Sequence, residues 1–208
     1  MDLSFYIPAF VTLFVVIDPI GLTPIFVALT QGMSERQRRA IAIRSVLVAF
    51  GILLLFGLAG EAVLNFLGIS MAAFRMAGGI LLFLTALDML FERRTQRRQD
   101  QADTAQTEDL DDDPSVFPLA IPLLGGPGAI ASMILHTGQG TGALHIAAVH
   151  GVMMLVLLIA FALFLLAAPI ERLLGPTGIT VVTRLLGMLL AALSVQFVID
   201  GLRDLQVI

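Results

Sequence analysis

Six long apolar segments dominate this sequence and constrain its fold more than any other feature. One membrane-spanning helix needs about 20 consecutive, mostly apolar residues, and each segment reaches that length. Hydrophobic residues make up 58% of the 208 residues and charged residues only 13%, against about 45–50% and about 25% in soluble domains. The sequence therefore predicts one all-α integral membrane domain over 1–208 and excludes a water-soluble enzyme. The predicted spans are 5–30, 41–66, 70–91, 116–137, 143–168 and 179–202.

The arginines predict how these spans are oriented. All 12 basic residues are Arg, and most lie in 36–44 and in the polar stretch 92–115. Loops rich in Arg stay in the cytoplasm, so both termini are expected outside it. Residues 92–115 have no apolar periodicity, which is typical of a disordered linker. The first span lacks the basic start of a signal peptide, so we expect it to be retained.

Several functional classes find no support in the residues. Basic residues are few and confined to short loops, so nucleic acid is not an expected partner. Cysteine is absent, which excludes a disulfide framework and a thiol nucleophile. Enzyme and phosphate-loop motifs are missing, and the spans hold no cluster of acids for a metal. The sequence therefore predicts neither an enzyme nor a metal or cofactor site.

Two sequence features recur at nearly the same offset. Pro19 and Pro127 lie 108 residues apart within Pro/Gly breaks, and Arg75 and Arg184, each followed by x-x-Gly, lie 109 apart. This spacing predicts a duplication, with repeat one at about 5–91 and repeat two at about 116–205. Three spans per repeat is an odd number, so the second copy must enter the membrane inverted. Such inverted repeats are common among secondary transporters.

The first span of each repeat is predicted to break where its Pro and Gly residues gather. Thr23 followed by Pro24 resembles an N-cap with Pro at the first helical position, and Gly126-Pro127 would start another half-helix. Half-helix N-termini inside a membrane can bind anions, whereas simple structural kinks are the alternative. The candidate substrate-binding residues are Asp18, Pro19, Gly21 and Thr23 in the first break, and Gly125, Gly126, Gly128 and Ala129 in the second.

Asp18 is the most distinctive candidate, because a carboxylate within the bilayer is costly unless it is paired, hydrated or protonated. It could attract a substrate cation, carry a coupling proton, or cap its own broken helix. The counterpart of Asp18 in the second repeat is Gly126, so no acid competes there. We hypothesise that a zwitterion bridges the repeats, with its ammonium toward Asp18 and its carboxylate toward the Gly-rich turn.

Charged residues near span ends form a second set of candidates. Arg75, Arg184 and Asp88 are expected to brace helix ends or to take part in gating, and contact with substrate is the alternative for the two arginines. Glu61 is the expected partner of Arg75. The three histidines (His136, His145 and His150) are expected at the surface or in packing.

The two breaks and one further motif resemble the MarC family of bacterial membrane proteins. The resemblance rests on Asp18-Pro19-Ile20-Gly21 with Pro24, on FRMAGGILLFL at 74–84, and on AIPLLGGPGAI at 120–130. It implies a protein of the bacterial inner membrane, distantly similar to LysE-type exporters.

Transport of small neutral amino acids is attributed to some members of this family. We therefore expect a secondary transporter of small neutral amino acids or similar metabolites, with proton coupling as one option. An ion channel or exporter and a non-transport scaffold are the alternatives. Beyond the lipid bilayer and a small-molecule substrate no partner is predicted, and the oligomeric state stays open.

Overall fold

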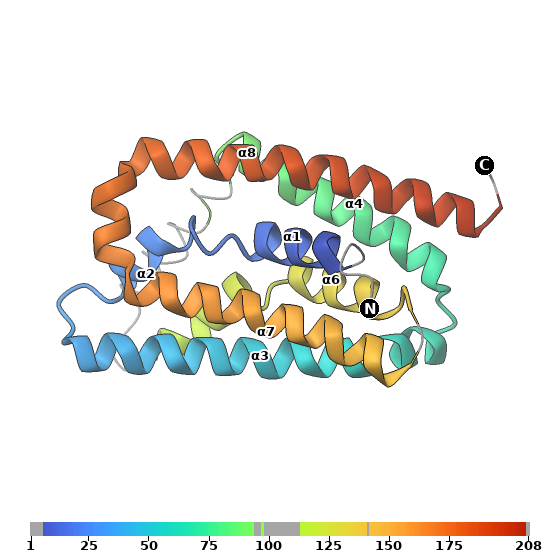
Figure 1. Cartoon of the computed structure of the whole chain (residues 1–208), viewed down its shortest axis with the longest axis horizontal. Helices are drawn as coiled ribbons and strands as arrows, with labels where there is room; N and C mark the ends of the chain where they lie inside the picture. The colour runs from blue at the N-terminus through green and yellow to red at the C-terminus, as the bar shows by residue number, and fades with distance from the viewer. Residues whose placement is uncertain (1–5, 94–96, 98–112, 141, 207–208) are drawn as a thin grey trace.

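The computed structural model describes residues 6–93, 97, 113–140 and 142–206, and every regular element in this part of the chain is helical. The predicted linker over 92–115 lies mostly outside the described residues. Short helices occupy the middle of the molecule, with long helices on both sides of them (Figure 1). The elements are α1 (Tyr6–Ile17), α2 (Thr23–Leu29), α3 (Glu35–Phe66), α4 (Met71–Leu90), η2 (Ser115–Leu124), α6 (Pro127–Thr137), α7 (Ala143–Leu165) and α8 (Ala167–Asp204). Segment η2 is irregular, with extended backbone at Phe117 and Ile121.

Four helices of the described chain are long and apolar enough to cross a membrane: α3, α4, α7 and the part of α8 from Arg172 to Asp204. The pair η2 and α6, bent by 52°, would be a fifth span. The predicted first span is divided into α1, which is apolar but only 12 residues long, and α2. The prediction of an all-helical, multi-pass membrane protein is confirmed, with four to five spans identified by length and composition.

Local sequence signals explain several helix boundaries. Ser34 and Gln37 form a capping box at the start of α3, and the Ser70 hydroxyl accepts a hydrogen bond of 3.1 Å from the Ala73 N–H at the start of α4; such caps satisfy free N–H groups. The last predicted span, 179–202, was too short. Helix α8 extends from Ala167 to Asp204 and is interrupted at Gly175 (φ 62°), directly before Pro176.

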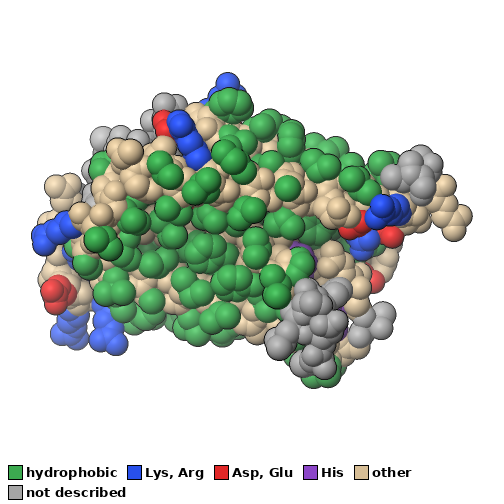
Figure 2. Space-filling model, turned by 45° about the horizontal axis from the view of Figure 1, so that its top comes forward, with side chains coloured by type: hydrophobic (Ala, Val, Ile, Leu, Met, Phe, Trp, Pro, Cys, Tyr) green, Lys and Arg blue, Asp and Glu red, His purple; other side chains and the backbone are tan. Residues whose placement is uncertain are grey.

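The surface has the character of a membrane protein. Hydrophobic side chains cover the middle of the face shown in Figure 2, while charged side chains lie at its two ends and in one group along its upper edge. Large apolar residues of α3, α4, α7 and α8 are exposed, among them Leu55, Leu84, Leu158 and Leu189. Exposed apolar surface of this extent marks an interaction with lipid or protein, and the charged ends suit the aqueous boundaries.

Helices α4 and α8 pack closely and antiparallel. Arg75 near the start of α4 forms an ion pair with Asp204 at the end of α8, and Arg184 of α8 forms one with Glu92 beyond α4. Glycines permit the close approach: a Cβ at Gly79 would lie 2.8 Å from the Ser194 carbonyl oxygen. Small residues at helix contacts are typical of membrane proteins.

Contacts between a helix of the first half and a helix of the second half come in matched pairs, in which the corresponding helices of the two halves change places. Helix α1 packs on α7 as η2 packs on α3, and α2 packs on α8 as α6 packs on α4. The N and C marks in Figure 1 lie toward one end of the long axis, and the connection between α2 and α3 lies at the other. The first and second halves are therefore intimately packed against each other.

Candidate functional site

The first break, residues 18–22, forms hydrogen bonds within its own turn. Asp18 has a φ of 54° and is 1% exposed, and its carboxylate accepts a hydrogen bond of 3.1 Å from the Gly21 N–H. A Cβ at Gly21 would lie 2.2 Å from the Asp18 Oδ2, so the close contact requires glycine. The Asp18 carboxylate thus stabilises the turn before α2, whereas α2 itself has no side-chain cap. The roles in substrate and proton binding stay predictions.

The expected N-cap of α2 was wrong by one residue. Leu22 is the N-cap, so Thr23 is the first helical residue and Pro24 the second. The Thr23 hydroxyl donates a hydrogen bond of 3.1 Å to the Pro19 carbonyl. A buried hydroxyl needs a hydrogen-bond acceptor. The Thr23 hydroxyl therefore points back toward the Pro19 carbonyl, which lies one turn earlier in the break.

The second break starts a new helix where the sequence predicted. Gly126 is the N-cap of α6 and Pro127 its first residue, while the Gly125 N–H donates to the Ala120 carbonyl at 2.8 Å. The first N–H groups of a helix have no partner within it, and here they belong to Gly128 and Ala129. A Cβ at Gly128 would lie 2.9 Å from Val16 of α1, so the two halves of the chain meet at this glycine.

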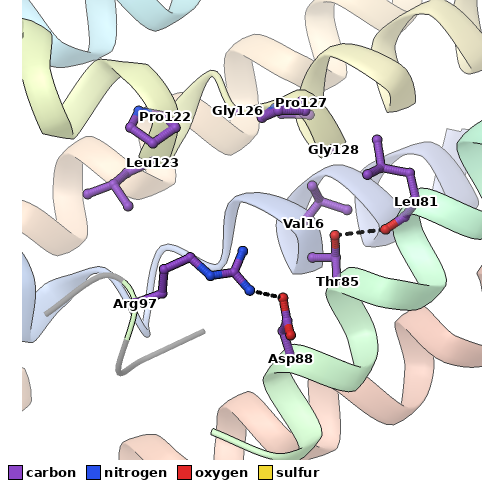
Figure 3. A pocket seen from close by; sticks show the side chains of 11 residues that line it. Val16, Leu81, Thr85, Asp88, Arg97, Pro122, Leu123, Gly126, Pro127 and Gly128 are labelled. Carbon is purple, nitrogen blue, oxygen red and sulfur yellow. Dashed lines mark hydrogen bonds and ion pairs between the residues drawn. The ribbon is translucent and has the colours of Figure 1, made fainter. Parts of the chain in front are cut away.

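A cavity of about 290 Å³ lies at this second break (Figure 3). It is formed by α1 and α4 from the first half of the chain and by η2 and α6 from the second, together with Arg97. Three of the predicted substrate-binding residues line it, Gly126, Gly128 and Ala129, as does Asp88 from the second set of candidates. Gly125 lines a neighbouring cavity instead. The lining residues are Val16, Leu81, Thr85, Asp88, Arg97, Pro122, Leu123, Gly126, Pro127, Gly128 and Ala129. We call this space the polar cavity.

Asp88 is the acid of the polar cavity. It forms an ion pair with Arg97, and the Thr85 hydroxyl donates to the Leu81 carbonyl at 2.9 Å (Figure 3). Asp18, Pro19, Gly21 and Thr23 are not among the residues that line the polar cavity. The structure thus brings the second Gly-rich turn together with Asp88, which sequence analysis considered only for bracing or gating.

Thr85 and Arg97 were missed by sequence analysis. Thr85 precedes Asp88 by three residues, a spacing that places two side chains on the same helix face, so a polar face on α4 could have been noticed. Arg97 lies in the polar stretch between the halves, where no periodicity assigns it to any site.

The two symmetric arginines have different surroundings. The Arg75 side chain is 13% exposed and pairs with Asp204, which corrects the expectation of Glu61, while that of Arg184 is 49% exposed and pairs with Glu92 at 2.6 Å. Asp204 is the last residue of α8, and the antiparallel packing of α8 on α4 brings it to Arg75. Both contacts hold the ends of the α4–α8 pair together, as bracing predicts; gating stays a prediction.

The histidines serve packing and local hydrogen bonds. His136 is buried and meets Phe197 edge-on with ring centroids 5.5 Å apart. His145 Nε2 lies 2.9 Å from the His136 carbonyl, and His150 Nδ1 lies 2.7 Å from the Ile146 carbonyl. Across the described residues, no group of three or more His, Asp or Glu could hold a metal ion.

Fold and surface together define a multi-pass helical membrane protein with a charged cavity at a helix break. Residues 3–206 match the family described as "MarC family integral membrane protein". The chain belongs to the MarC family, which confirms the resemblance seen in the sequence.

Relatives occur in archaea and bacteria. The chain is 38% identical to a "UPF0056 membrane protein" of Archaeoglobus fulgidus, in an alignment covering 97% of this chain and 94% of that protein. It is 35% identical to the "UPF0056 membrane protein YvbG" of Bacillus subtilis (99% and 97% covered) and 33% identical to the "UPF0056 membrane protein YhcE" of Escherichia coli (98% and 94% covered). No solved structure matches the chain.

Proposed function

We propose that this protein is a secondary transporter of small neutral amino acids or similar metabolites. The observation that carries the proposal is the polar cavity, which places charged groups and a helix N-terminus at a break within an otherwise apolar molecule. Asp88 lies two residues before the end of α4, so its charge costs less there than at the bilayer centre and can meet a substrate that enters from water. The polar cavity has a volume of about 290 Å³, which far exceeds the roughly 30 Å³ that one water occupies.

The polar cavity offers the two electrostatic poles that a zwitterion needs. Asp88 supplies a carboxylate for an ammonium group. The N–H groups of Gly128 and Ala129, at the positive end of the α6 dipole, suit a carboxylate, and Arg97 adds a cation at the same cavity. In this proposal Asp88 takes the part that sequence analysis gave to Asp18.

An architecture of six spans in two inverted repeats is part of the proposal. It is supported by the helix contacts that exchange the two halves and by the reciprocal ion pairs of Arg75 and Arg184. The broken elements α1–α2 and η2–α6 would each count as one span. Transporters of this kind bind substrate at the repeat interface and expose it by rocking one repeat against the other.

The proposed orientation follows the arginines. The loop between α2 and α3 and residues 92–115 would lie in the cytoplasm, and both termini outside it, in the inner membrane of a bacterium. Reporter fusions at Gln106 and at the C-terminus should then report opposite sides. The same side for both would contradict the six-span arrangement.

Transport is tested with purified protein in proteoliposomes. Vesicles loaded with one unlabelled amino acid should take up the same labelled amino acid from outside, with saturation. A panel of neutral amino acids, run with and without a pH gradient, identifies substrates and tests proton coupling. Electrogenic flux without saturable exchange would favour the ion channel, and no flux for any solute would favour a scaffold.

A further inference from the structure

A separate pocket lies beside the connection between α2 and α3, at the end of the molecule away from the N and C marks in Figure 1. Its volume of about 450 Å³ is within the range of about 300–1,000 Å³ that is typical of small-molecule sites. Residues of α2 and of the connection form it, together with Arg38 from the first turn of α3. We call it the Arg38 pocket. Among the described residues, it shares no lining residue with the polar cavity.

Arg38 is the charged group of this pocket, and two contacts hold its side chain in place. Its Nε–H donates a hydrogen bond of 3.1 Å to the Thr30 hydroxyl, which itself donates to the Phe26 carbonyl at 2.7 Å. The guanidinium also lies 6.0 Å from the centre of the Phe26 ring, a distance at which a cation is attracted to an aromatic face. These contacts leave the two terminal guanidinium nitrogens to a ligand, and a side chain already held in place costs less to order on binding.

The charge of Arg38 is not balanced by an acid. No carboxylate of the described chain forms an ion pair with Arg38. Residues 31–44 hold four arginines and a single acid, Glu35, and the neighbouring Arg36 and Arg39 are exposed. The pocket is therefore complementary to an anion. A guanidinium suits phosphate in particular, because it offers two parallel N–H donors.

Another part of the pocket wall is apolar. Pro24, Val27 and Ala28 of α2 line it, and their spacing of three and four residues places them on one face of the helix. All three are partly exposed. The pocket thus combines a positioned cation with apolar surface, in an integral membrane protein. A free phosphate ion would match the cation alone, whereas a phospholipid matches both.

We propose that the Arg38 pocket binds an anionic phospholipid, with the lipid phosphate at the Arg38 guanidinium and an acyl chain along the apolar wall of α2. Basic pockets on the cytoplasmic side of membrane proteins bind anionic head groups, and the orientation proposed above puts this end of the molecule there. The site is separate from the polar cavity, so the proposal does not depend on which solute the protein transports.

Thermal unfolding of the purified protein in detergent tests this proposal. A ligand that binds only the folded state raises Tm, by about 3–6 °C for a chain of this size at a concentration tenfold above Kd. Dioleoylphosphatidylglycerol, titrated to saturation, should give such a rise. Dioleoylphosphatidylcholine has the same acyl chains but no net charge, and inorganic phosphate has the charge but no chains. Each of these should raise Tm by less than about 1 °C, since each satisfies only part of the pocket.

Substitutions of two adjacent arginines locate the site. Arg38→Gln should reduce the rise with phosphatidylglycerol to less than about 1 °C, because the charged donors to the phosphate are lost. The matched control is Arg39→Gln, which removes the same charge from an exposed residue that does not line the pocket and should keep the rise. Each variant is compared with itself without lipid, so lower stability from the lost hydrogen bond to Thr30 is not mistaken for lost binding.

Equal rises with the two lipids would overturn the proposal, because the pocket would then not recognise charge. An equal rise with inorganic phosphate would show an anion site that does not need a lipid. Loss of the rise in both variants would show diffuse attraction to the whole basic end, and its retention in Arg38→Gln would exclude this arginine. If Arg38→Gln does not fold, the responses of wild type and Arg39→Gln still decide. Amino-acid exchange is measured separately, so none of these results bears on the proposed transport function.

Discussion

The two helix breaks are counterparts in sequence but differ in their surroundings. At the first break the Asp18 carboxylate accepts from the Gly21 N–H, and the Thr23 hydroxyl donates to the Pro19 carbonyl. At the second break the turn at Gly126 lines a cavity, and so do Gly128 and Ala129, whose N–H groups start α6. The first break has hydrogen bonds within its own turn, whereas the second lines a cavity that also holds Asp88 and Arg97.

This difference teaches that paired breaks need not share one role. Non-helical backbone inside a membrane must be satisfied by protein or by a polar cavity, and this chain uses both solutions. An acid in the first break provides the acceptor that the turn requires. Glycines in the second break carry no side chain that would cover the backbone N–H groups at the start of α6, so the candidate binding groups lie at this break.

The largest effect is expected when the second break loses its close contact with α1. Gly128→Val should reduce amino-acid exchange more than about tenfold, because a Cβ would lie 2.9 Å from Val16 and overpacking costs about 1–3 kcal/mol. Gly151→Val is the matched control, since a Cβ there would meet nothing within 4 Å. Exchange assays on both reconstituted proteins check this. Equal activity of the two variants would remove the second break from the site.

Neutralising each acid compares the two breaks directly. Asp88→Asn should lower exchange about tenfold, because hydrogen bonds to charged groups contribute about 1.5–3 kcal/mol. Asp18→Asn should stay within about twofold of wild type, because Asn caps about as well as Asp. Initial rates of exchange at saturating and limiting substrate check both variants. The reverse ranking would restore Asp18 as the substrate pole.

The symmetric arginines extend the comparison from activity to stability. Arg75→Gln should lower the free energy of unfolding by about 1–3 kcal/mol, since it leaves a largely buried position without its charged hydrogen bond to Asp204. Arg184→Gln should cost less than about 1 kcal/mol, as exposed ion pairs do. Thermal unfolding in detergent measures both, with Asp204→Asn completing a double-mutant cycle. Equal losses of unfolding free energy in the two variants would show that the burial of Arg75 does not make its ion pair stronger than that of Arg184.

The smallest effect on stability is expected at Asp113, which lies just before η2 at the start of the second half of the chain. Burial raises the pKa of Asp113, but hydrogen bonds from Ser115 and the Arg44 guanidinium outweigh this and hold the pKa below its ordinary value of 3.8. A lowered pKa stabilises the fold above pH 4 and loses this contribution as the pH falls through the lowered value. Wild type should exceed Asp113→Asn by less than about 1 kcal/mol at pH 7, and the gap should close toward pH 3. A gap that widens on acidification would contradict this assignment.

The sequence was sufficient to predict what depends on hydrophobicity and helix breakers. Runs of apolar residues predicted the helical membrane fold, and Gly126-Pro127 predicted the start of α6. The motifs around both breaks also identified the MarC family. These features are local, so neighbouring residues alone determine them.

Features that depend on distant residues could not be predicted. Arg75 pairs with Asp204 across the whole chain, and nothing near Arg75 indicates that α8 runs on to that point. Asp88 and Gly128 line one cavity only because α4 packs against α6. The position of Asp18 within its own turn depends on a φ of 54°, which the sequence Asp-Pro does not specify.

The most direct test of the account is whether substrate protects the second break from chemical labelling. The natural chain has no cysteine, so Thr85→Cys places a single thiol in the polar cavity and Ile20→Cys a single, partly exposed thiol in the first break. Labelling by a membrane-permeant maleimide is followed in proteoliposomes with and without a transported amino acid. The account predicts that substrate slows labelling of Thr85→Cys at least about threefold and leaves Ile20→Cys unchanged. Labelling of Thr85→Cys that no transported amino acid slows, or protection at Ile20→Cys instead, would contradict it.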